Sequence, residues 1–65
     1  MDILLKQIMQ ERRLTVRQVA IMTDLPKSTV ADIMSGRISP RMDIMEQLAA
    51  GLKVRITELF ESDFK

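Results

Sequence analysis

Apolar residues recur at helical spacing in five successive segments of the chain. In the first segment one stripe contains Leu4, Leu5, Ile8 and Met9, which predicts a helix over about 2–12. Asp2 precedes this stripe and is a suitable N-cap, because its carboxylate can accept from the free amides of a first turn. No segment shows sustained alternation of apolar and polar residues, so the pattern contains no evident strand.

The next two segments are short and lie close together. Thr15 is the expected cap of a second helix over about 15–23, and a connection of about three residues leads into a third helix that ends before Gly36. Helices joined by so short a turn must cross steeply. The small side chain of Ala20 stands where their backbones would approach. This arrangement predicts a helix-turn-helix over about 15–35.

Two further helices are expected in the last third. Ser39 followed by Pro40 predicts the start of a fourth helix, with serine as cap and proline at the first helical position. Thr57 is the expected cap of a fifth helix, which would turn Leu59 and Phe60 inward. The apolar stripe of the fourth helix consists of Met45, Leu48, Ala49 and Leu52.

Composition agrees with one small helical domain. The 65 residues are 46% hydrophobic and 29% charged, with only two glycines and two prolines, so we expect a single all-α domain spanning 1–65. Cysteine and histidine are absent, which removes disulfides, the commonest metal ligands and the usual nucleophile–base pairs. We therefore expect no enzyme, no metal and no cofactor. The apolar run Ile3-Leu4-Leu5 is far too short to span a membrane, so we expect a cytoplasmic protein.

Charge is distributed unevenly along the chain. The net charge is only +1, but residues 12–41 carry six basic and two acidic side chains, a local net of +4. Residues 42–65 carry three basic and five acidic side chains, a net of −2, and residues 1–11 contribute −1. One basic surface can therefore meet an anion while the rest of the molecule stays neutral or acidic.

A series of short motifs runs through the chain without a gap. They are Leu14-Thr15, Val19-Ala20, Lys27-Ser28-Thr29-Val30, Gly36-Arg37 followed by Pro40, Leu48-Ala49, and Leu59-Phe60. In this order they resemble the Cro/lambda-repressor-type, or xenobiotic-response-element-like, helix-turn-helix family over 47 of the 65 residues. The resemblance implies a compact five-helix, lambda-repressor-like domain whose third helix enters the major groove of double-stranded DNA.

The resemblance also implies which side chains read bases. Lys27, Ser28, Ala31 and Asp32 stand at the base-reading positions of the third helix, with Thr29 as a marginal member. Lys27 can donate to guanine O6 and N7, Ala31 can touch a thymine methyl, and Asp32 can accept from cytosine N4. Ser28 can serve several bases. The alternative is that Lys27 meets only phosphate, and that Asp32 is solvated or hydrogen-bonds Ser28.

Contacts to the DNA backbone are expected on either side of this helix. The free amides from Thr15 to Gln18 suit a phosphate at the start of the second helix, and Arg17 can reinforce them. Arg37 and Arg41 lie after the third helix, where the family meets the backbone or the minor groove. Such contacts position the protein without reading sequence. The alternative is that these arginines are merely solvated.

The chain departs from the family pattern at several positions. Many members pair an arginine in the first helix with a glutamate late in the third, whereas both positions are methionine here, Met9 and Met34. We expect these two to form a core contact, since burying an ion pair is costly. Arg13, Asp24 and Lys53 stand where the family commonly has glycine. If their backbones are left-handed, each costs about 1 kcal/mol, least for aspartate.

Together these observations predict a sequence-specific, DNA-binding transcriptional regulator, a repressor that reads a palindromic operator as a homodimer. Phe64 is a candidate for packing across the two-fold axis, one turn beyond Phe60, or else belongs to a frayed end. The alternative is an antitoxin or another protein-interaction module on the same scaffold, with a toxin or a phage regulator as partner. A third reading is a helix-turn-helix domain that has lost DNA binding.

Overall fold

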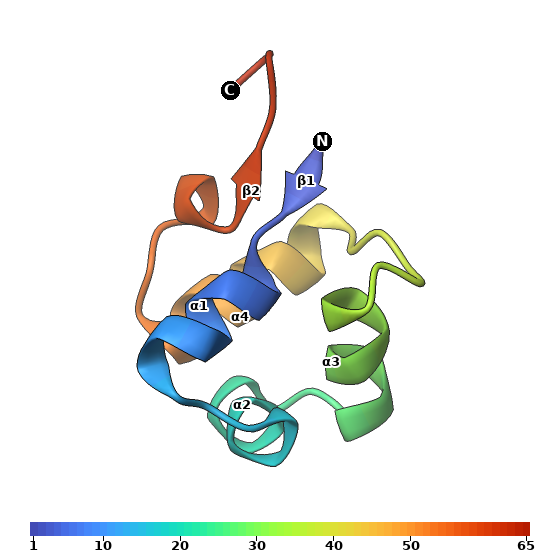
Figure 1. The fold of residues 1–65 in the computed structure, drawn as a ribbon, viewed down its shortest axis with the longest axis vertical. Coiled ribbons are helices and arrows are strands. Elements are labelled where there is room, and N and C mark those ends of the chain that lie inside the picture. Colours follow the sequence, from blue (N-terminus) through green and yellow to red (C-terminus); the bar gives the residue numbers. More distant parts are fainter.

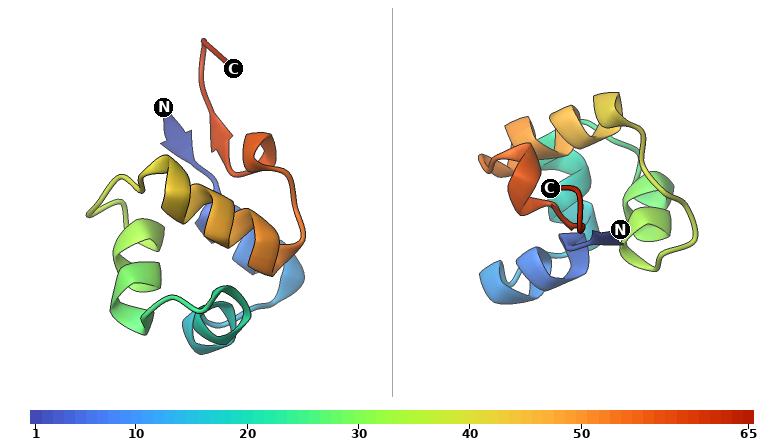
Figure 2. Two further views of the ribbon diagram at one scale, coloured as in Figure 1. Left: turned by 180° about the vertical axis from the view of Figure 1, so that it is seen from behind. Right: turned by 90° about the horizontal axis from the view of Figure 1, so that it is seen from above.

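The computed structural model describes all 65 residues and consists of four α-helices, one 3₁₀ helix and two very short strands (Figure 1). In chain order the elements are β1 (Asp2–Ile3), α1 (Leu5–Arg12), α2 (Val16–Thr23), α3 (Lys27–Met34), α4 (Met42–Leu52), η1 (Ile56–Glu58) and β2 (Phe60–Glu61). Figures 1 and 2 show α3 on one side of the α1 and α4 pair, with both chain ends at the pole opposite α2. The predicted small helical domain is confirmed. The predicted number of five helices is not, because the structure has four α-helices and a single 3₁₀ turn.

The start of the chain differs from the prediction. The first helix begins at Leu5, and Asp2 is not its cap but part of β1, which pairs antiparallel with β2. Asp2 lies opposite Glu61, and Ile3 lies opposite Phe60. The Leu4 amide continues this pairing by donating to the Leu59 carbonyl over 2.8 Å. The backbone polar groups at the start of the chain therefore bond to its far end instead of opening a helix.

The same pairing shortens the predicted fifth helix. Thr57 does not cap it, because the helical segment begins after Arg55 and is a single 3₁₀ turn with no side-chain cap. The Leu59 amide donates to the Ile56 carbonyl, and Phe60 then enters the strand. Phe64 accordingly lies on the segment after β2 and not one helical turn beyond Phe60.

The fourth helix also begins later than its sequence signal. Arg41 is its N-cap residue, with extended backbone, and Met42 is the first helical residue. Ser39 is thus not the cap, and Pro40 is not the first helical position. Asp43 supplies the favourable charge in the first turn, and its carboxylate accepts from the Ile44 amide at 2.9 Å. The predicted apolar stripe of this helix is correct, and all four of its side chains are buried.

One apolar core joins all four helices to the segment after α4. Its fully buried side chains are Leu5, Val19, Val30, Met45, Leu48, Leu52 and Leu59. Met9 belongs to this core, and Met34 is half-buried against it, so both methionines pack as apolar residues. A direct contact between these two side chains stays a prediction.

Three residues that are not glycine end helices in the left-handed conformation. Arg13 closes α1 with φ 56°, Asp24 closes α2 with φ 59°, and Lys53 closes α4 with φ 58°. These are the positions where the family commonly has glycine. Gly36, two residues beyond α3, is also left-handed, with φ 80°. The predicted end of the third helix before Gly36 is therefore confirmed, and Gly36 takes the left-handed conformation that favours glycine just beyond a helix.

Helix α2 is held closely against α4. A β-carbon added at Gly51 would lie 2.5 Å from the Met22 carbonyl oxygen and 2.7 Å from Thr23 Cα, so only glycine fits the crossing. The side-chain amide of Gln47 donates to the carbonyls of Thr23 and Asp24, at 2.9 and 3.2 Å. These contacts satisfy carbonyls that the end of α2 leaves free, and they hold the end of α2 against α4.

Candidate nucleic-acid interface

Local sequence signals determine where α2 begins. The Thr15 hydroxyl accepts from the Gln18 amide at 3.1 Å, and the Gln18 side-chain oxygen accepts from the Thr15 amide at 2.8 Å. This reciprocal pair is a capping box, so the predicted cap at Thr15 is confirmed. The role of Gln18 as its partner was missed, although the spacing of threonine and glutamine three residues apart is the usual signal for it.

The turn between α2 and α3 sets the direction of the second helix. The Leu25 amide donates to the Ala20 carbonyl over 3.2 Å, and Leu25 is buried beneath the turn. Pro26 follows as the N-cap residue of α3, with extended backbone and no side-chain cap. Ala20 is also buried, and its position where the two helix backbones approach stays a prediction. The steep crossing leaves the outer side of α3 uncovered.

The base-reading candidates all lie along α3 and none of them is buried. Lys27 and Ser28 are exposed in its first turn, and Thr29, Ala31 and Asp32 are half-buried. The core side of the helix is formed by Val30 and Ile33, which are completely or almost completely buried. Helical phase therefore places Ser28, Ala31 and Asp32 on the side away from the core. The five candidates are thus at least partly accessible on α3, and their contact with bases stays a prediction.

The charged neighbour of Asp32 is Arg37, and not Ser28 as one alternative from the sequence suggested. No hydrogen bond joins it to Ser28; its carboxylate lies 3.9 Å from Nε of Arg37 in an exposed ion pair. Ser35 completes the local arrangement by donating its hydroxyl to the Asp32 carbonyl at 3.2 Å. The guanidinium of Arg37 thus stands beside the carboxylate, in a pair too exposed to hold either group firmly.

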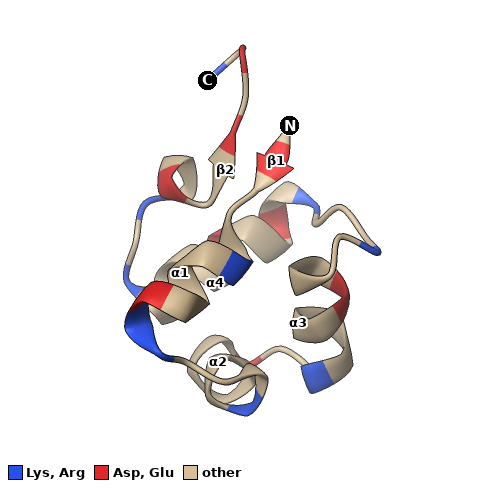
Figure 3. Ribbon diagram, in the orientation of Figure 1, with Lys and Arg blue, Asp and Glu red and all other residues tan.

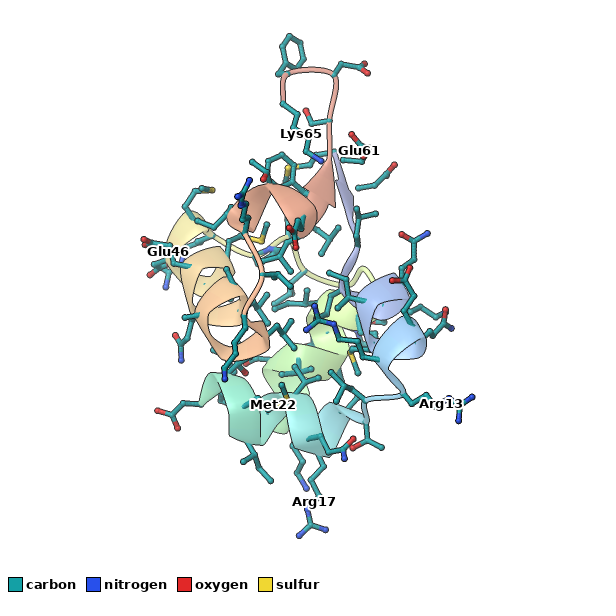
Figure 4. The ribbon with its side chains drawn as sticks, turned by 90° about the vertical axis from the view of Figure 1, so that its left-hand side faces the viewer. Arg13, Arg17, Met22, Glu46, Glu61 and Lys65 are labelled. Carbon is teal, nitrogen blue, oxygen red and sulfur yellow. The ribbon has the colours of Figure 1, made fainter.

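The candidates for phosphate contact occur in two groups. Arg17 and Lys27 line one shallow depression between α2 and α3, together with Ile21 and Leu25. Figure 4 shows Arg17 extending away from the body of the protein, at the pole opposite the tail. Within the capping box, Thr15 and Gln18 already use their side-chain oxygens for each other. The groups near Thr15 and Gln18 that can still donate to an anion are the free backbone amides at the start of α2 and the side-chain NH₂ of Gln18.

The second group lies on the loop between α3 and α4. Arg37 and Arg41 have side chains that are 78% and 81% exposed. Arg41 lies 3.5 Å from Asp43 in another exposed ion pair. Figure 3 shows basic positions on α2, at the start of α3 and along this loop, whereas acidic positions mark both strands. Basic residues also occur towards the ends of the sequence, and Lys65 lies 3.7 Å from Glu61 of β2, so the separation of charge is partial.

Other kinds of site have little support in this structure. No group of three or more acidic, histidine or cysteine side chains is arranged to hold a metal ion. None of the helices has the length and hydrophobicity needed to cross a membrane. Every buried side-chain nitrogen or oxygen has a hydrogen-bond partner within the protein.

Comparison with known proteins agrees with this geometry. A helix-turn-helix family model matches residues 5–59, which is 55 of the 65 residues and includes all four α-helices. A search of curated proteins found no match to the chain. The steep α2–α3 pair, the uncovered outer side of α3 and this match lead to one conclusion: the chain belongs to the Cro/C1-type helix-turn-helix family of DNA-binding regulators.

Proposed function

We propose that this chain is a sequence-specific repressor of transcription that reads the major groove of a palindromic operator as a homodimer. The observation that carries the proposal is the exposed start and outer side of α3, where Lys27, Ser28 and Asp32 project beside the basic residues Arg17 and Arg37. A major groove admits one helix, and these side chains include both donors and acceptors for base edges.

Each side chain has a definite expected role. Lys27 donates to guanine O6 and N7, Asp32 accepts from cytosine N4, and Ala31 packs against a thymine methyl. Ser28 is adaptable, because its hydroxyl both donates and accepts. Arg17, Arg37 and the start of α2 hold the phosphates on either side.

Dimerisation and repression follow from the size of the reading surface. One short helix contacts too few base pairs to identify an operator, and two copies related by a two-fold axis double the site. A bound dimer blocks access to the DNA that it covers, so repression requires no further part of the molecule.

Selection of bound duplexes from a random pool tests sequence specificity directly. We expect enriched sites that are inverted repeats, with half-sites about one helical turn apart. Enrichment of no sequence, with binding retained, would reduce the proposal to a non-specific DNA binder.

Lys27→Ala tests the assignment of α3. We expect affinity for the selected site to fall by about 1–3 kcal/mol, the range for a good base contact, with little change for random duplex. Binding is measured by fluorescence anisotropy with both duplexes. An equal loss on both would make Lys27 a phosphate contact.

A protein-interaction module remains the alternative function, and exposed apolar side chains favour it. Ile21 on α2 is 74% exposed, and Met22 is exposed beside it. Titration of random duplex at two salt concentrations separates the two functions, because only a DNA binder loses affinity steeply as salt rises.

A further inference from the structure

The chain folds back onto α3 directly after this helix ends. Gly36 has a left-handed φ of 80°, which reverses the direction of the chain without a β-carbon to crowd it. The backbone amides of Arg37 and Ile38 then donate to the Asp32 carbonyl, at 2.9 and 3.3 Å. The Ser35 hydroxyl donates to the same oxygen at 3.2 Å. One backbone oxygen of α3 therefore anchors the loop that carries Arg37.

These backbone contacts bring the side chains of Asp32 and Arg37 together. The nearest atoms are Oδ1 of Asp32 and Nε of Arg37, which lie 3.9 Å apart. A carboxylate has a second oxygen and a guanidinium has further N–H groups, so both side chains can also bind partners outside the protein. Of the two side chains, 38% and 78% are exposed. A possible acceptor for a base and a possible donor to a phosphate thus stand side by side at the outer side of α3.

A carboxylate on a DNA-binding surface needs a cation close to it. Duplex DNA carries one negative charge per about 1.7 Å of its axis, so an isolated Asp32 carboxylate would be repelled from the groove. The guanidinium of Arg37 compensates this charge. In the free protein the ion pair is too exposed to be strong. When DNA displaces the water around it, the effective dielectric constant falls and the attraction between the two groups increases.

Arg41 on the same loop provides a comparison within the molecule. Its side chain is 81% exposed and lies 3.5 Å from the carboxylate of Asp43. Asp43 belongs to the first turn of α4 and is not a candidate for base reading. The two arginines therefore carry the same charge in the same kind of exposed ion pair. Only the side chain of Arg37 is paired with a residue of α3.

From these observations we propose that Arg37 is a positioning residue for base reading. It compensates the charge of Asp32 and holds Oδ1, so that Oδ2 accepts from cytosine N4. This inference rests on the proposed function, in which Asp32 reads a base and Arg37 holds a phosphate. The two contacts are coupled, so the loss of Arg37 changes which base is preferred. A phosphate contact ordinarily carries no sequence information, and Arg37 departs from this rule through Asp32.

Fluorescence anisotropy of the full chain with two duplexes tests the coupling. The first duplex is the site selected from the random pool, and the second differs only at the base pair whose preference Asp32→Ala abolishes. The ratio of the two dissociation constants measures the base preference. We expect a preference of about tenfold or more for the unaltered chain, as for one good base contact, and of less than about threefold for Arg37→Gln.

Arg41→Gln is the matched control, because it removes the same charge from the same loop. We expect it to weaken binding to both duplexes by the same factor and to keep the base preference within about twofold of the unaltered chain. Arg37→Lys retains a positive charge near the carboxylate, so it should keep at least about half of the preference. Arg37→Gln combined with Asp32→Ala should lose no more preference than Asp32→Ala alone. Circular dichroism confirms that each variant is folded.

Three results would overturn the coupling. If Arg37→Gln weakens binding to both duplexes but keeps the full preference, Arg37 is a phosphate contact only. If Arg41→Gln loses the preference to the same extent, the effect belongs to the overall charge. If Asp32→Ala alters no base preference, Asp32 reads no base and has nothing to couple.

Failure of the proposed function is recognised at an earlier step. A random pool that yields no enriched sequence overturns both the sequence-specific function and the coupling. A pool that yields an enriched site supports sequence-specific binding, whatever Arg37→Gln then does. In that case an unchanged preference in Arg37→Gln removes the coupling alone.

Discussion

At the scale of single residues, the three left-handed helix ends lower the stability of the fold, because a residue other than glycine stands at each of them. Arg13, Asp24 and Lys53 all have φ between 56° and 59°, where a β-carbon crowds the following carbonyl oxygen. Aspartate tolerates this conformation better than arginine or lysine, because its short polar side chain bonds locally. The three sites should therefore respond unequally to glycine.

Lys53→Gly is expected to stabilise the fold by about 1 kcal/mol, and Asp24→Gly by less, because glycine adopts positive φ without a steric penalty. For a domain of this size, about 1 kcal/mol corresponds to a melting temperature roughly 4–8 °C higher. Ala50→Gly is the matched control. Ala50 is exposed in the last turn of α4, where the backbone is right-handed, and its replacement by glycine should cost up to about 1 kcal/mol. Thermal unfolding of the three variants measures the contrast, and a decrease for Lys53→Gly would refute strain at that residue.

The methionine pair gives a second test at this scale. Met9 is 4% exposed, so Met9→Arg should destabilise the fold by about 3 kcal/mol or more through an unpaired buried charge. Adding Met34→Glu recreates the ion pair typical of the family and should recover at least about 1 kcal/mol of that loss. Urea unfolding of the single and double variants gives the coupling energy. Simple additivity would show that the two side chains do not meet.

At the scale of elements, local sequence signals predicted the start of α2 better than they predicted the structure at the ends of the chain. Thr15 and Ala20 define the start and the crossing of α2 through contacts within the helix-turn-helix, so spacing alone was sufficient. The pairing of Asp2 with Glu61 joins segments at opposite ends of the sequence. Two-residue strands have no periodicity to detect. The helix start expected at Asp2 and the α-helix expected from Thr57 were both wrong for this single reason.

The α3–α4 connection shows a different limit. Ser39 and Pro40 are good helix-start residues, but the chain stays extended through Arg41 before α4 begins. Helix propensity describes only which residues suit the start of a helix. The number of residues in the loop depends instead on the distance that the chain must cover between the end of α3 and the start of α4. The sequence placed Arg37 and Arg41 after the third helix, but it did not predict the length of the loop that carries them or the exposure of Ile38.

The crossing of α2 and α4 gives a test at the element scale. Gly51→Ala normally favours a helix by about 1 kcal/mol, yet here the added carbon meets the backbone of Met22 and Thr23. Neither of these backbone atoms can move without displacing α2. We therefore expect a net loss of about 1–3 kcal/mol, typical of overpacking. Urea unfolding measures it, and unchanged or increased stability would mean that α2 is free to shift.

At the scale of the whole molecule, the distribution of charge matters more than the net charge of +1. Basic side chains near α3 can release counterions from DNA, while the acidic ends of the chain keep the total charge small (Figure 3). A uniformly charged molecule of this net charge would bind DNA poorly. The salt dependence of binding should therefore depend on the position of each basic residue and not on their number.

Two variants, Arg17→Gln and Arg55→Gln, test whether DNA binding depends on where a basic residue lies or only on how many basic residues there are. Each variant removes one positive charge from an exposed side chain. Arg17 lies beside Lys27 in the depression between α2 and α3. Arg55 directly precedes η1, and Figure 1 shows the segment of η1 on the side of the molecule opposite α3. We expect Arg17→Gln to reduce the slope of log affinity against log salt by about 1, the value for one lost phosphate contact, and Arg55→Gln to leave it unchanged. Anisotropy titrations of random duplex over a range of salt concentrations supply both slopes. Equal reductions of the two slopes would mean that DNA binding depends on the overall charge of the protein. The surface around α3 would then not be the specific DNA-binding surface.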